Sequence, residues 1–502
     1  MRKFVFLVFA LFFLSFVSAS FWSSPVEIEP QMANFYEMDI DSLGFVHLVY
    51  SNGGIYYNKI NPQNLSGTGS ILPGINTAVS ADVIVDSMGN ALVEWDDYNY
   101  PYNNIMFNRF DSSGNPLMNN TLLVSQSNPA QIRSIITGDD YGNVHMLYSD
   151  WNSSTGKNLN YLKFNENGSI LSGPIGVTNA MMFDIDEHEG VLHVIAFDWG
   201  WPMGFGASMQ YVRINGTQVS TPLILETNST TPLLYSYGRP KISVSPNGVV
   251  GAVWATTNAL QFQPHYIRFA VINESGVSAY VPFVGGGGFD VAPEILMDNS
   301  DVAHVSWKSI VLGVGQQVFY AALDKFGNYI TTPGHITNLP TTNYQGYFGT
   351  NSQMGIDDYG NIFMTWSSFS YLGLQYMPAG IVNINGTANI GNTIAFELED
   401  LQHRNLNYTF ALSFGNSGFY LPDGKKIPLD VDDAFLVSTG NPAGAGLSHS
   451  KGVLDNGRDV VHWTIPNDSA LIGKTFYASF VTSDLQDTRI RSVADAVAVN
   501  VV

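Results

Sequence analysis

Three segments of the chain place a carboxylate directly before aromatic side chains. The acids are Asp97, Asp150 and Asp198, and the aromatic residues that follow them are Tyr98, Trp151, Trp199 and Trp201. Aromatic rings offer flat apolar surfaces for stacking, while carboxylates accept hydrogen bonds from hydroxyl groups. A sugar ring presents both an apolar face and hydroxyls, so this combination predicts a carbohydrate-binding site.

Two arginines belong to the same candidate site. Arg133 precedes Asp139, and Arg239 precedes Ser245, by six residues each. Guanidinium groups supply several N–H donors to hydroxyls and carboxylates. The leading hypothesis is a recognition protein that binds a glycan or glycoprotein, with no catalytic residue assigned. Paired carboxylates also act on glycosidic bonds, so a glycoside hydrolase or polysaccharide lyase using the same acids is the enzymatic alternative. A purely structural cell-surface protein is the third hypothesis.

Histidines recur at one position behind a repeated turn. They are His47, His145, His193 and His304, and the other copies of the turn carry Leu92, Gly251 and Phe363 there. Because apolar residues replace them, we expect the histidines to be packing residues, and we expect His145→Leu to leave the fold nearly intact. The chain has no cysteine, so we predict no metal and no cofactor. Calcium among the aspartates is the one alternative, although no EF-hand-like loop supports it.

These side chains belong to a unit that occurs seven times. Its turns begin at Asp41, Asp86, Asp139, Asp186, Ser245, Asp298 and Asp357. Aspartate closes such a turn on its own backbone, and glycine supplies the positive φ. Four short strands per unit, separated by Gly, Asn and Asp, predict a seven-bladed β-propeller. Residues 24–30 have no partner in the first unit, so we expect them to complete the last blade and close the ring.

A propeller brings the start of each innermost strand and the end of each second strand to one face. The arginines precede innermost strands, and the acids follow second strands. We therefore expect Arg133, Arg239, Asp97, Asp150 and Asp198 to converge on that face.

The repeat resembles those of secreted propellers in the broad sialidase-like group. The resemblance rests on the pattern D-x-x-G-N-h-H-h-x-W followed by Y-x-K/R-h-D/N-x-x-G, and it covers about residues 21 to 380. It implies the blade architecture. It does not imply sialidase activity, because Trp366 follows Gly360 by six residues instead of three and no arginine triad is present.

The repeat stops near residue 380, but apolar and polar residues still alternate in the remaining segment. Turns at LPDGKK and LDNGRD separate its extended stretches. This pattern predicts an antiparallel β-sandwich of roughly eight strands, interpreted as a spacer or docking module. The expected organisation is a signal peptide at 1–19, a seven-bladed propeller at 20–383 and a sandwich at 384–502.

The N-terminus and the composition both favour an exported protein. Arg2 and Lys3 precede an apolar run that ends in small residues, which is typical of a cleaved secretory signal or, alternatively, of an uncleaved N-terminal anchor. The net charge of −21 argues against nucleic acid and anionic lipid as partners. We expect a secreted or cell-surface monomer without a membrane span after cleavage, and its N-x-S/T sequons make it a candidate glycoprotein.

Overall fold

The computed structural model describes most of the chain from residue 26 onward. The described residues are 26–29, 35–41, 44–51, 54–61, 67–71, 78–99, 102–111, 113, 115–126, 133–152, 156–180, 182–198, 207–227, 239–257, 265–273, 276–281, 284, 290–298, 301–311, 315–337, 352–357, 361–367, 372–377, 380–400, 405–420, 426–483 and 490–502. The predicted signal peptide at 1–19 lies outside them. Within the described residues, no helix has the length and apolar character needed to cross a membrane.

The chain separates into two compact units. The first contains Met1–Gly355 and Phe363–Gln375, and the second contains Ile356–Ile362 and Tyr376–Val502. The predicted boundary at 383/384 falls within strand β30 (Ile381–Asn385), which pairs with β31 (Thr393–Glu399) of the second unit.

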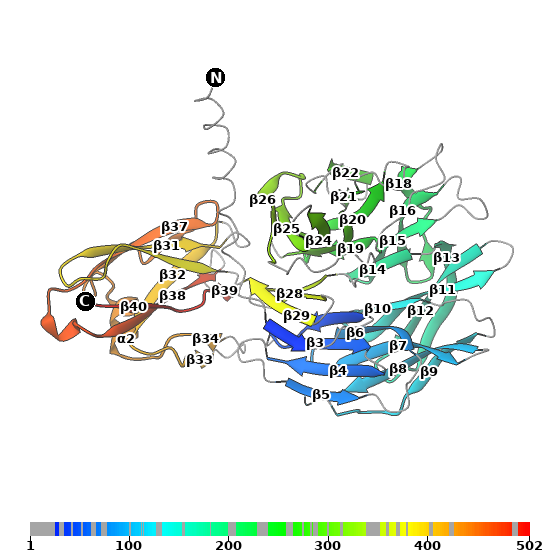
Figure 1. Cartoon of the computed structure of the whole chain (residues 1–502), viewed down its shortest axis with the longest axis horizontal. Coiled ribbons are helices and arrows are strands. Elements are labelled where there is room, and N and C mark those ends of the chain that lie inside the picture. Colours follow the sequence, from blue (N-terminus) through cyan, green and yellow to red (C-terminus); the bar gives the residue numbers. More distant parts are fainter. Residues whose placement is uncertain are drawn as a thin grey trace, which may run out of the picture. The chain divides into compact units, whose positions relative to one another are not determined.

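Strands β2 to β13 of the first unit form three antiparallel sheets in chain order (Figure 1). The first sheet contains β2 (Tyr36–Ile40), β3 (Val46–Ser51), β4 (Ile55–Ile60) and β5 (Gly67–Ile71). The second contains β6 (Ala78–Val85), β7 (Ala91–Asn99), β8 (Tyr102–Phe110) and β9 (Thr121–Gln126). The third contains β10 (Ser134–Gly138), β11 (Asn143–Asn152), β12 (Gly156–Asn165) and β13 (Ile170–Asn179).

The next strands repeat this arrangement. The fourth sheet contains β14 (Met182–His188), β15 (Val191–Asp198), β16 (Ser208–Asn215), β17 (Gln218–Val219) and β18 (Leu223–Thr227). The fifth contains β19 (Lys241–Val244), β20 (Val250–Thr257), β21 (His265–Asn273) and β22 (Gly276–Val281). The sixth contains β23 (Val291–Met297), β24 (Ala303–Val311), β25 (Gly315–Leu323) and β26 (Tyr329–His335). The last contains β27 (Gln353–Ile356), β28 (Ile362–Ser367), β29 (Leu372–Met377) and β1 (Val26–Glu29).

The last sheet combines strands from both ends of the first unit. Strand β1 pairs antiparallel with β29, with Val26 opposite Leu374, which confirms the predicted pairing for Val26–Glu29, the described part of residues 24–30. The last inner strand also meets the first one, because a Cβ on Gly355 would lie 2.5 Å from Cγ1 of Ile40. Consecutive small sheets that return to the first one form a multi-bladed β-propeller.

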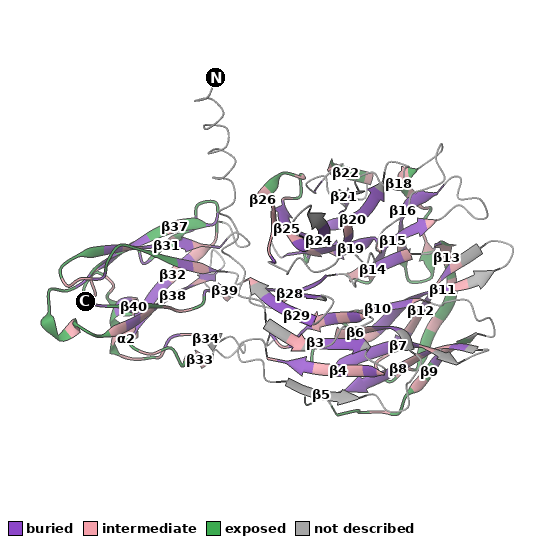
Figure 2. Cartoon of the chain, in the orientation of Figure 1, coloured by how far each residue is buried: buried purple, intermediate pink, exposed green. Residues whose placement is uncertain are grey.

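The burial pattern follows from this radial stacking. The middle strands are buried almost throughout, as in β15 and β16, whereas the innermost strand β14 is partly buried and outer strands such as β13 are largely exposed (Figure 2). The aromatic residues near the ends of second strands belong to the core, since Trp95, Trp254, Trp307 and Trp366 are at most 1% exposed. The apolar and aromatic residues that recur after each turn in the sequence are therefore the residues that pack between adjacent sheets.

The recurring turn has the chemistry expected of it. Asp86 Oδ1 accepts hydrogen bonds from the backbone N–H groups of Met88 and Asn90, and Gly89 has a φ of 75°. One predicted copy is wrong: Asp186 lies inside β14, and the turn is made by Glu189 and Gly190. Both have positive φ, as a two-residue hairpin loop requires.

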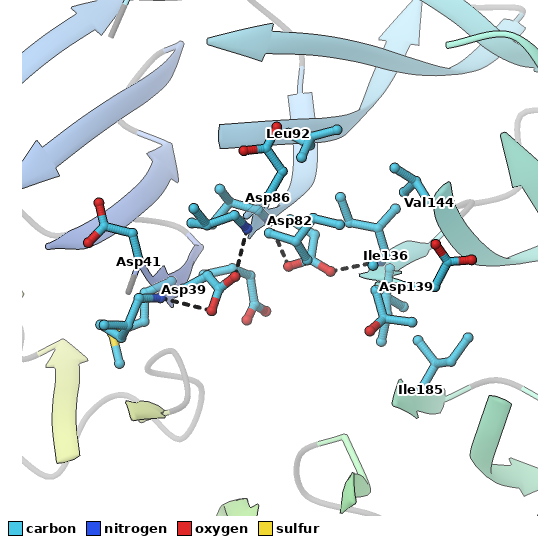
Figure 3. A pocket seen from close by; sticks show the side chains of 18 of the residues that line it. Asp39, Asp41, Asp82, Asp86, Leu92, Ile136, Asp139, Val144 and Ile185 are labelled. Carbon is cyan, nitrogen blue, oxygen red and sulfur yellow. Dashed lines mark hydrogen bonds between the residues drawn. The ribbon is translucent and has the colours of Figure 1, made fainter. Parts of the chain in front are cut away.

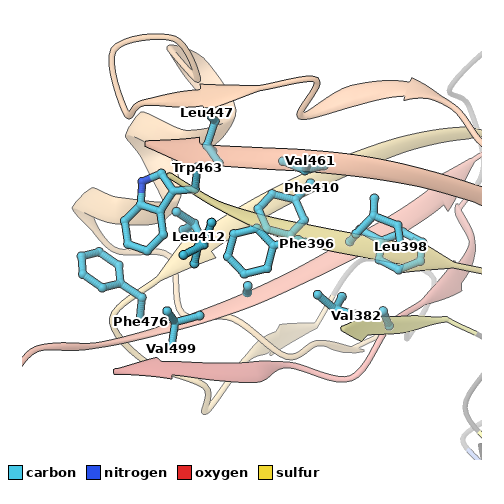
Figure 4. Close-up of a cluster of buried hydrophobic side chains, with 14 of the residues drawn as sticks. Val382, Phe396, Leu398, Phe410, Leu412, Leu447, Val461, Trp463, Phe476 and Val499 are labelled. Atoms are coloured by element: carbon cyan, nitrogen blue, oxygen red, sulfur yellow. The ribbon is translucent and has the colours of Figure 1, made fainter. Parts of the chain in front are cut away.

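The second unit has two main antiparallel sheets around one core. One contains β30, β31, β35 (Leu447–Ser448) and β37 (Arg458–Thr464). The other contains β32 (Asn407–Ser413), β36 (Lys451–Val453), β38 (Thr475–Ser483), β39 (Ile490–Val493) and β40 (Val497–Asn500). Phe396 and Trp463 from the first sheet pack with Phe410 and Phe476 from the second (Figure 4).

Shorter elements complete this unit. Strands β33 (Phe419–Tyr420) and β34 (Lys426–Ile427) form a small hairpin, and η1 (Ser469–Leu471) is a 3-10 turn. Helix α2 (Asp433–Gly440) was not expected from the sequence; Asp432 caps it by accepting a hydrogen bond from the N–H of Phe435.

Candidate functional site

The structure describes the side chains of five predicted site residues. These are Asp97, Asp150, Asp198, Arg133 and Arg239, and all five are half-buried. Tyr98 and Trp151 are described only by their backbone, in β7 and β11, while Trp199 and Trp201 lie outside the described residues. The aromatic part of the predicted site therefore stays a prediction.

Strand pairing brings Arg133 and Asp150 to the same end of the third sheet. The N–H of Ser149 donates to the carbonyl of Arg133 over 3.0 Å, and the N–H of Arg133 donates to Oγ of Ser149. Asp150 is the next residue and accepts a 3.3 Å hydrogen bond from Asn158. Asp97 and Asp198 occupy corresponding strand ends, opposite Asn104 and Ser208.

The two arginines precede the inner strands of two different sheets, β10 and β19. Burial lowers the pKa of Arg133 to about 10, and the positive charge of Arg239 contributes to the shift. Nη1 of Arg239 lies 3.7 Å from Oε1 of Glu37, a residue of the first sheet. Arg239 thus reaches the inner strand of the first sheet and lines the inner cavity, whereas its convergence with Arg133 and the three acids stays a prediction.

Sequence reasoning missed a second group of charged side chains on the innermost strands. At one repeat position these strands carry Glu37, Asp82, Ile135, Asp184, Lys241, Glu294 and Gln353, and all seven line a single cavity of about 600 Å³. The sequence does indicate this group, because carboxylates interrupt otherwise apolar strands such as YEMDI and FDID.

Lys241 is the cation at the centre of this group. Its Nζ lies 3.3 Å from Oε2 of Glu294 and 3.9 Å from Oδ1 of Asp184. Burial alone would lower the pKa of Lys241, but the two carboxylates outweigh it and raise that pKa. Burial raises the pKa of Glu294 to about 8 and that of Asp184 to about 6, while Lys241 opposes both shifts.

Other inner acids connect neighbouring sheets. Asp39 Oδ2 accepts from the N–H of Val85 at 2.7 Å, and Asp82 Oδ2 accepts from the N–H of Ile136 at 2.9 Å (Figure 3). In the fourth sheet, Asp184 and Asp186 accept from the N–H groups of Ile242 and Val244 of the fifth sheet. An innermost strand has a ladder partner on one side only, so these carboxylates satisfy N–H groups that would otherwise be unpaired.

A buried carboxyl pair lies between the second and third sheets. Oγ of Ser134 is 2.7 Å from Oε2 of Glu94 and 2.6 Å from Oδ1 of Asp96, and Ser80 donates to Asp96 as well. The Ser134 hydroxyl thus lies between the two carboxyl groups. Burial and the charge of Asp96 raise the pKa of Glu94 well above its usual range, and burial also raises the pKa of Asp96 to about 6, so the pair binds protons more tightly than free carboxylates do.

The repeat histidines are buried, as predicted, but they do more than fill space. Nε2 of His145 lies 3.0 Å from Oδ2 of Asp139, and Nδ1 lies 2.8 Å from the hydroxyl of Tyr161. His47 and His304 repeat this bridge, and His193 keeps the tyrosine contact with Tyr211. In the described part of the chain, no group of three or more His, Asp or Glu side chains is arranged to hold a metal ion.

No protein-family model matches the chain, and no curated protein matches its sequence. Solved structures resemble it distantly. The β-propeller domain of the Trilobed protease from Pyrococcus furiosus has 8% identity, covering 68% of this chain and 94% of that chain, with a TM-score of 0.40. The polysaccharide lyase Uly1 has 11% identity, covering 70% and 90%, with a TM-score of 0.46. An exo-β-1,3-galactanase from Phanerochaete chrysosporium has 11% identity, covering 93% and 96%, with a TM-score of 0.33. We assign no activity to the chain from similarities this low.

Proposed function

We propose that the chain is an exported or cell-surface recognition protein that binds a glycan, free or on a glycoprotein, through one face of its propeller. That face carries the starts of the inner strands and the ends of the second strands. The proposal includes seven blades, formed by the sheets of β1 to β29, and a C-terminal β-sandwich that acts as a spacer or docking module.

The observation that supports this function best is the pairing of Arg133 with Ser149, which puts a half-buried arginine next to Asp150 at one end of the third sheet. No carboxylate of a described residue forms an ion pair with the Arg133 guanidinium, whose donors are therefore open to a ligand. Asp150 follows Ser149, the strand partner of Arg133, so a hydroxyl-bearing ligand would meet donors and acceptors together. Trp151, Trp199 and Trp201 would add stacking surfaces to this face.

The test is a glycan-array screen of the mature chain combined with polysaccharide-degradation assays. Trp199→Ala should weaken binding of the selected glycan by about 1–3 kcal/mol, because a stacked ring is lost. Asp150→Asn should weaken binding only moderately and should reveal no turnover. Tyr141→Ala is the matched control, since Tyr141 is 84% exposed beside the turn that precedes the same strand, β11, whereas Asp150 lies near the end of that strand.

Two results would overturn the proposal. Binding that survives both Trp199→Ala and Arg133→Met would place the ligand elsewhere. Hydrolytic or eliminative turnover that Asp150→Asn abolishes would make the protein a carbohydrate-active enzyme in place of a binder.

A further inference from the structure

The inner-strand cavity holds one buried donor without a partner among the described residues and one lysine whose carboxylate partners are distant. Gln353 is 4% exposed, and its Nε2 has no hydrogen-bond partner among the described residues. Lys241 is 7% exposed, and its nearest carboxylate oxygens, at 3.3 and 3.9 Å, are more distant than in a normal charge-assisted hydrogen bond. Both residues line the same cavity from different sheets. Buried polar groups normally find partners, so these N–H groups indicate an occupant that accepts hydrogen bonds.

The same cavity wall also presents acceptors. Glu37, Asp82, Asp184 and Glu294 stand at the repeat position of Lys241 and Gln353. An anion would be repelled by these acids, and a simple cation would be opposed by Lys241 and by Arg239, which also lines the cavity. A hydroxyl group both donates and accepts. Neighbouring hydroxyls of one ligand can therefore accept hydrogen bonds from the amide and ammonium groups and donate hydrogen bonds to the carboxyl groups.

We propose that this cavity binds one small neutral polyhydroxylated molecule, of the size class of a monosaccharide or cyclitol. A volume of about 600 Å³ lies within the range of small-molecule sites. Gln353 and Lys241 donate to ligand oxygens, and the ring acids accept from ligand hydroxyls. Arg239 belongs both to this cavity and to the proposed glycan-binding face, whereas Gln353 and Lys241 belong to the cavity alone.

The experiment titrates the full mature chain with D-glucose, D-galactose, D-xylose, myo-inositol and glycerol. Saturation-transfer NMR detects binding, and calorimetry measures stoichiometry and affinity. We expect saturable binding of at least one of these probes at one site per chain. Gln353→Leu, which keeps the side-chain volume and removes the amide, should weaken that binding roughly three- to tenfold, the equivalent of one lost hydrogen bond.

Controls separate this site from other effects. Ser243→Ala removes a hydroxyl from an inner strand outside the cavity lining and should leave binding unchanged, as should Trp199→Ala on the glycan-binding face. Gln353→Asn shortens the amide without removing it and serves if the leucine variant is unstable. The proposal is wrong if no probe saturates, if binding is unaltered in both Gln353 variants, or if an experimental structure soaked in the probe holds only water there.

Discussion

Asp139, His145 and Tyr161 form a hydrogen-bonded chain across three segments of one sheet: the turn, the second strand and the third strand. The carboxylate fixes the histidine tautomer, since Nε2–H donates to Asp139 and Nδ1 is left to accept from the tyrosine hydroxyl. Lys163 also donates to Asp139. In the second sheet Leu92 replaces histidine and Phe107, which has no hydroxyl, replaces tyrosine, while Arg109 binds Asp86 as Lys163 binds Asp139. The second sheet therefore has no buried tyrosine hydroxyl that needs a histidine, whereas a histidine-to-leucine substitution in the third sheet would leave that hydroxyl in place.

This network revises the expectation for His145→Leu. The substitution leaves the Tyr161 hydroxyl and one Asp139 oxygen without their buried partner, so the free energy of unfolding should fall by about 1–3 kcal/mol. Urea denaturation checks it, with Tyr161→Phe and the double variant completing a cycle. A double variant whose loss equals the sum of the single losses would show that the two side chains do not couple.

Buried carboxyls also predict a pH dependence. Burial and the nearby charge of Glu37 raise the pKa of Asp82 to about 7, and burial raises that of Glu294 to about 8. An acid with a raised pKa binds more protons folded than unfolded, so its contribution to stability is lost as pH rises toward the folded value. Buried His193, whose pKa falls from 6.5 to about 4, acts oppositely, but only below 6.5. Buried Lys308, whose pKa falls from 10.5 to about 7, also opposes the loss above about pH 7, but it is one group against Asp82, Asp186 and Glu294.

The free energy of unfolding should therefore decrease between about pH 6.5 and about pH 8.5. Urea unfolding at both values measures it. Asp82→Asn keeps an acceptor for the N–H of Ile136 and removes the titration, so the decrease should be smaller in this variant. A wild-type chain that is equally stable or more stable at the higher pH would contradict the assignment.

At the scale of the element, the inner strands are unusual because each has a strand partner on one side only. Side-chain carboxylates connect the first sheet to the second, the second to the third and the fourth to the fifth. The fifth and sixth sheets are connected by the Lys241–Glu294 ion pair and by the hydrogen bond from the N–H of Met297 to Ser243. Ser306 and Ser352 connect the sixth sheet to the last one. Gly251 stands where other sheets carry histidine because a Cβ there would approach Met297 and Ile295 within 3 Å.

Strand β1 completes the last sheet, so its removal should destabilise the first unit. Removal of residues 21–30 deletes the strand that pairs Val26 with Leu374 and Glu29 with Leu372. Loss of these ladder hydrogen bonds should lower the free energy of unfolding by roughly 2–4 kcal/mol, as measured by chemical denaturation. The matched control removes residues 21–25 and retains β1. Equal stability of the two truncated chains would exclude a closing role for the strand.

At the scale of the whole molecule, each compact unit has its own core. The second unit buries Phe396, Phe410, Trp463 and Phe476 between its two sheets. We therefore expect the fragment 380–502 to fold without the first unit. Calorimetry should show a single cooperative transition, and a fragment with unfolded-type amide NMR shifts would show that the second unit needs the first.

The sequence alone was enough for the all-β class, the repeated turn and the closing role of β1. These features depend on local chemistry: aspartate and glycine define turns, alternation defines strands, and an unpaired first strand requires a partner. Prediction from the sequence failed at Asp186, because a turn-like sequence there lies within strand β14. It also missed α2, a short helix that is stabilised by its cap and by packing.

The tertiary structure decided what the charged residues do. The role of Asp82, Asp184 or Lys241 depends on which neighbour faces it across the ring, and those neighbours lie more than 50 residues away in the sequence, as Ile136 and Ile242 do. Ring closure also turns one repeat position into a continuous cavity wall. Side-chain type and spacing are local properties, whereas burial, pairing and pKa are set only when distant strands meet. For that reason the roles of the inner acids could be identified only from the folded chain.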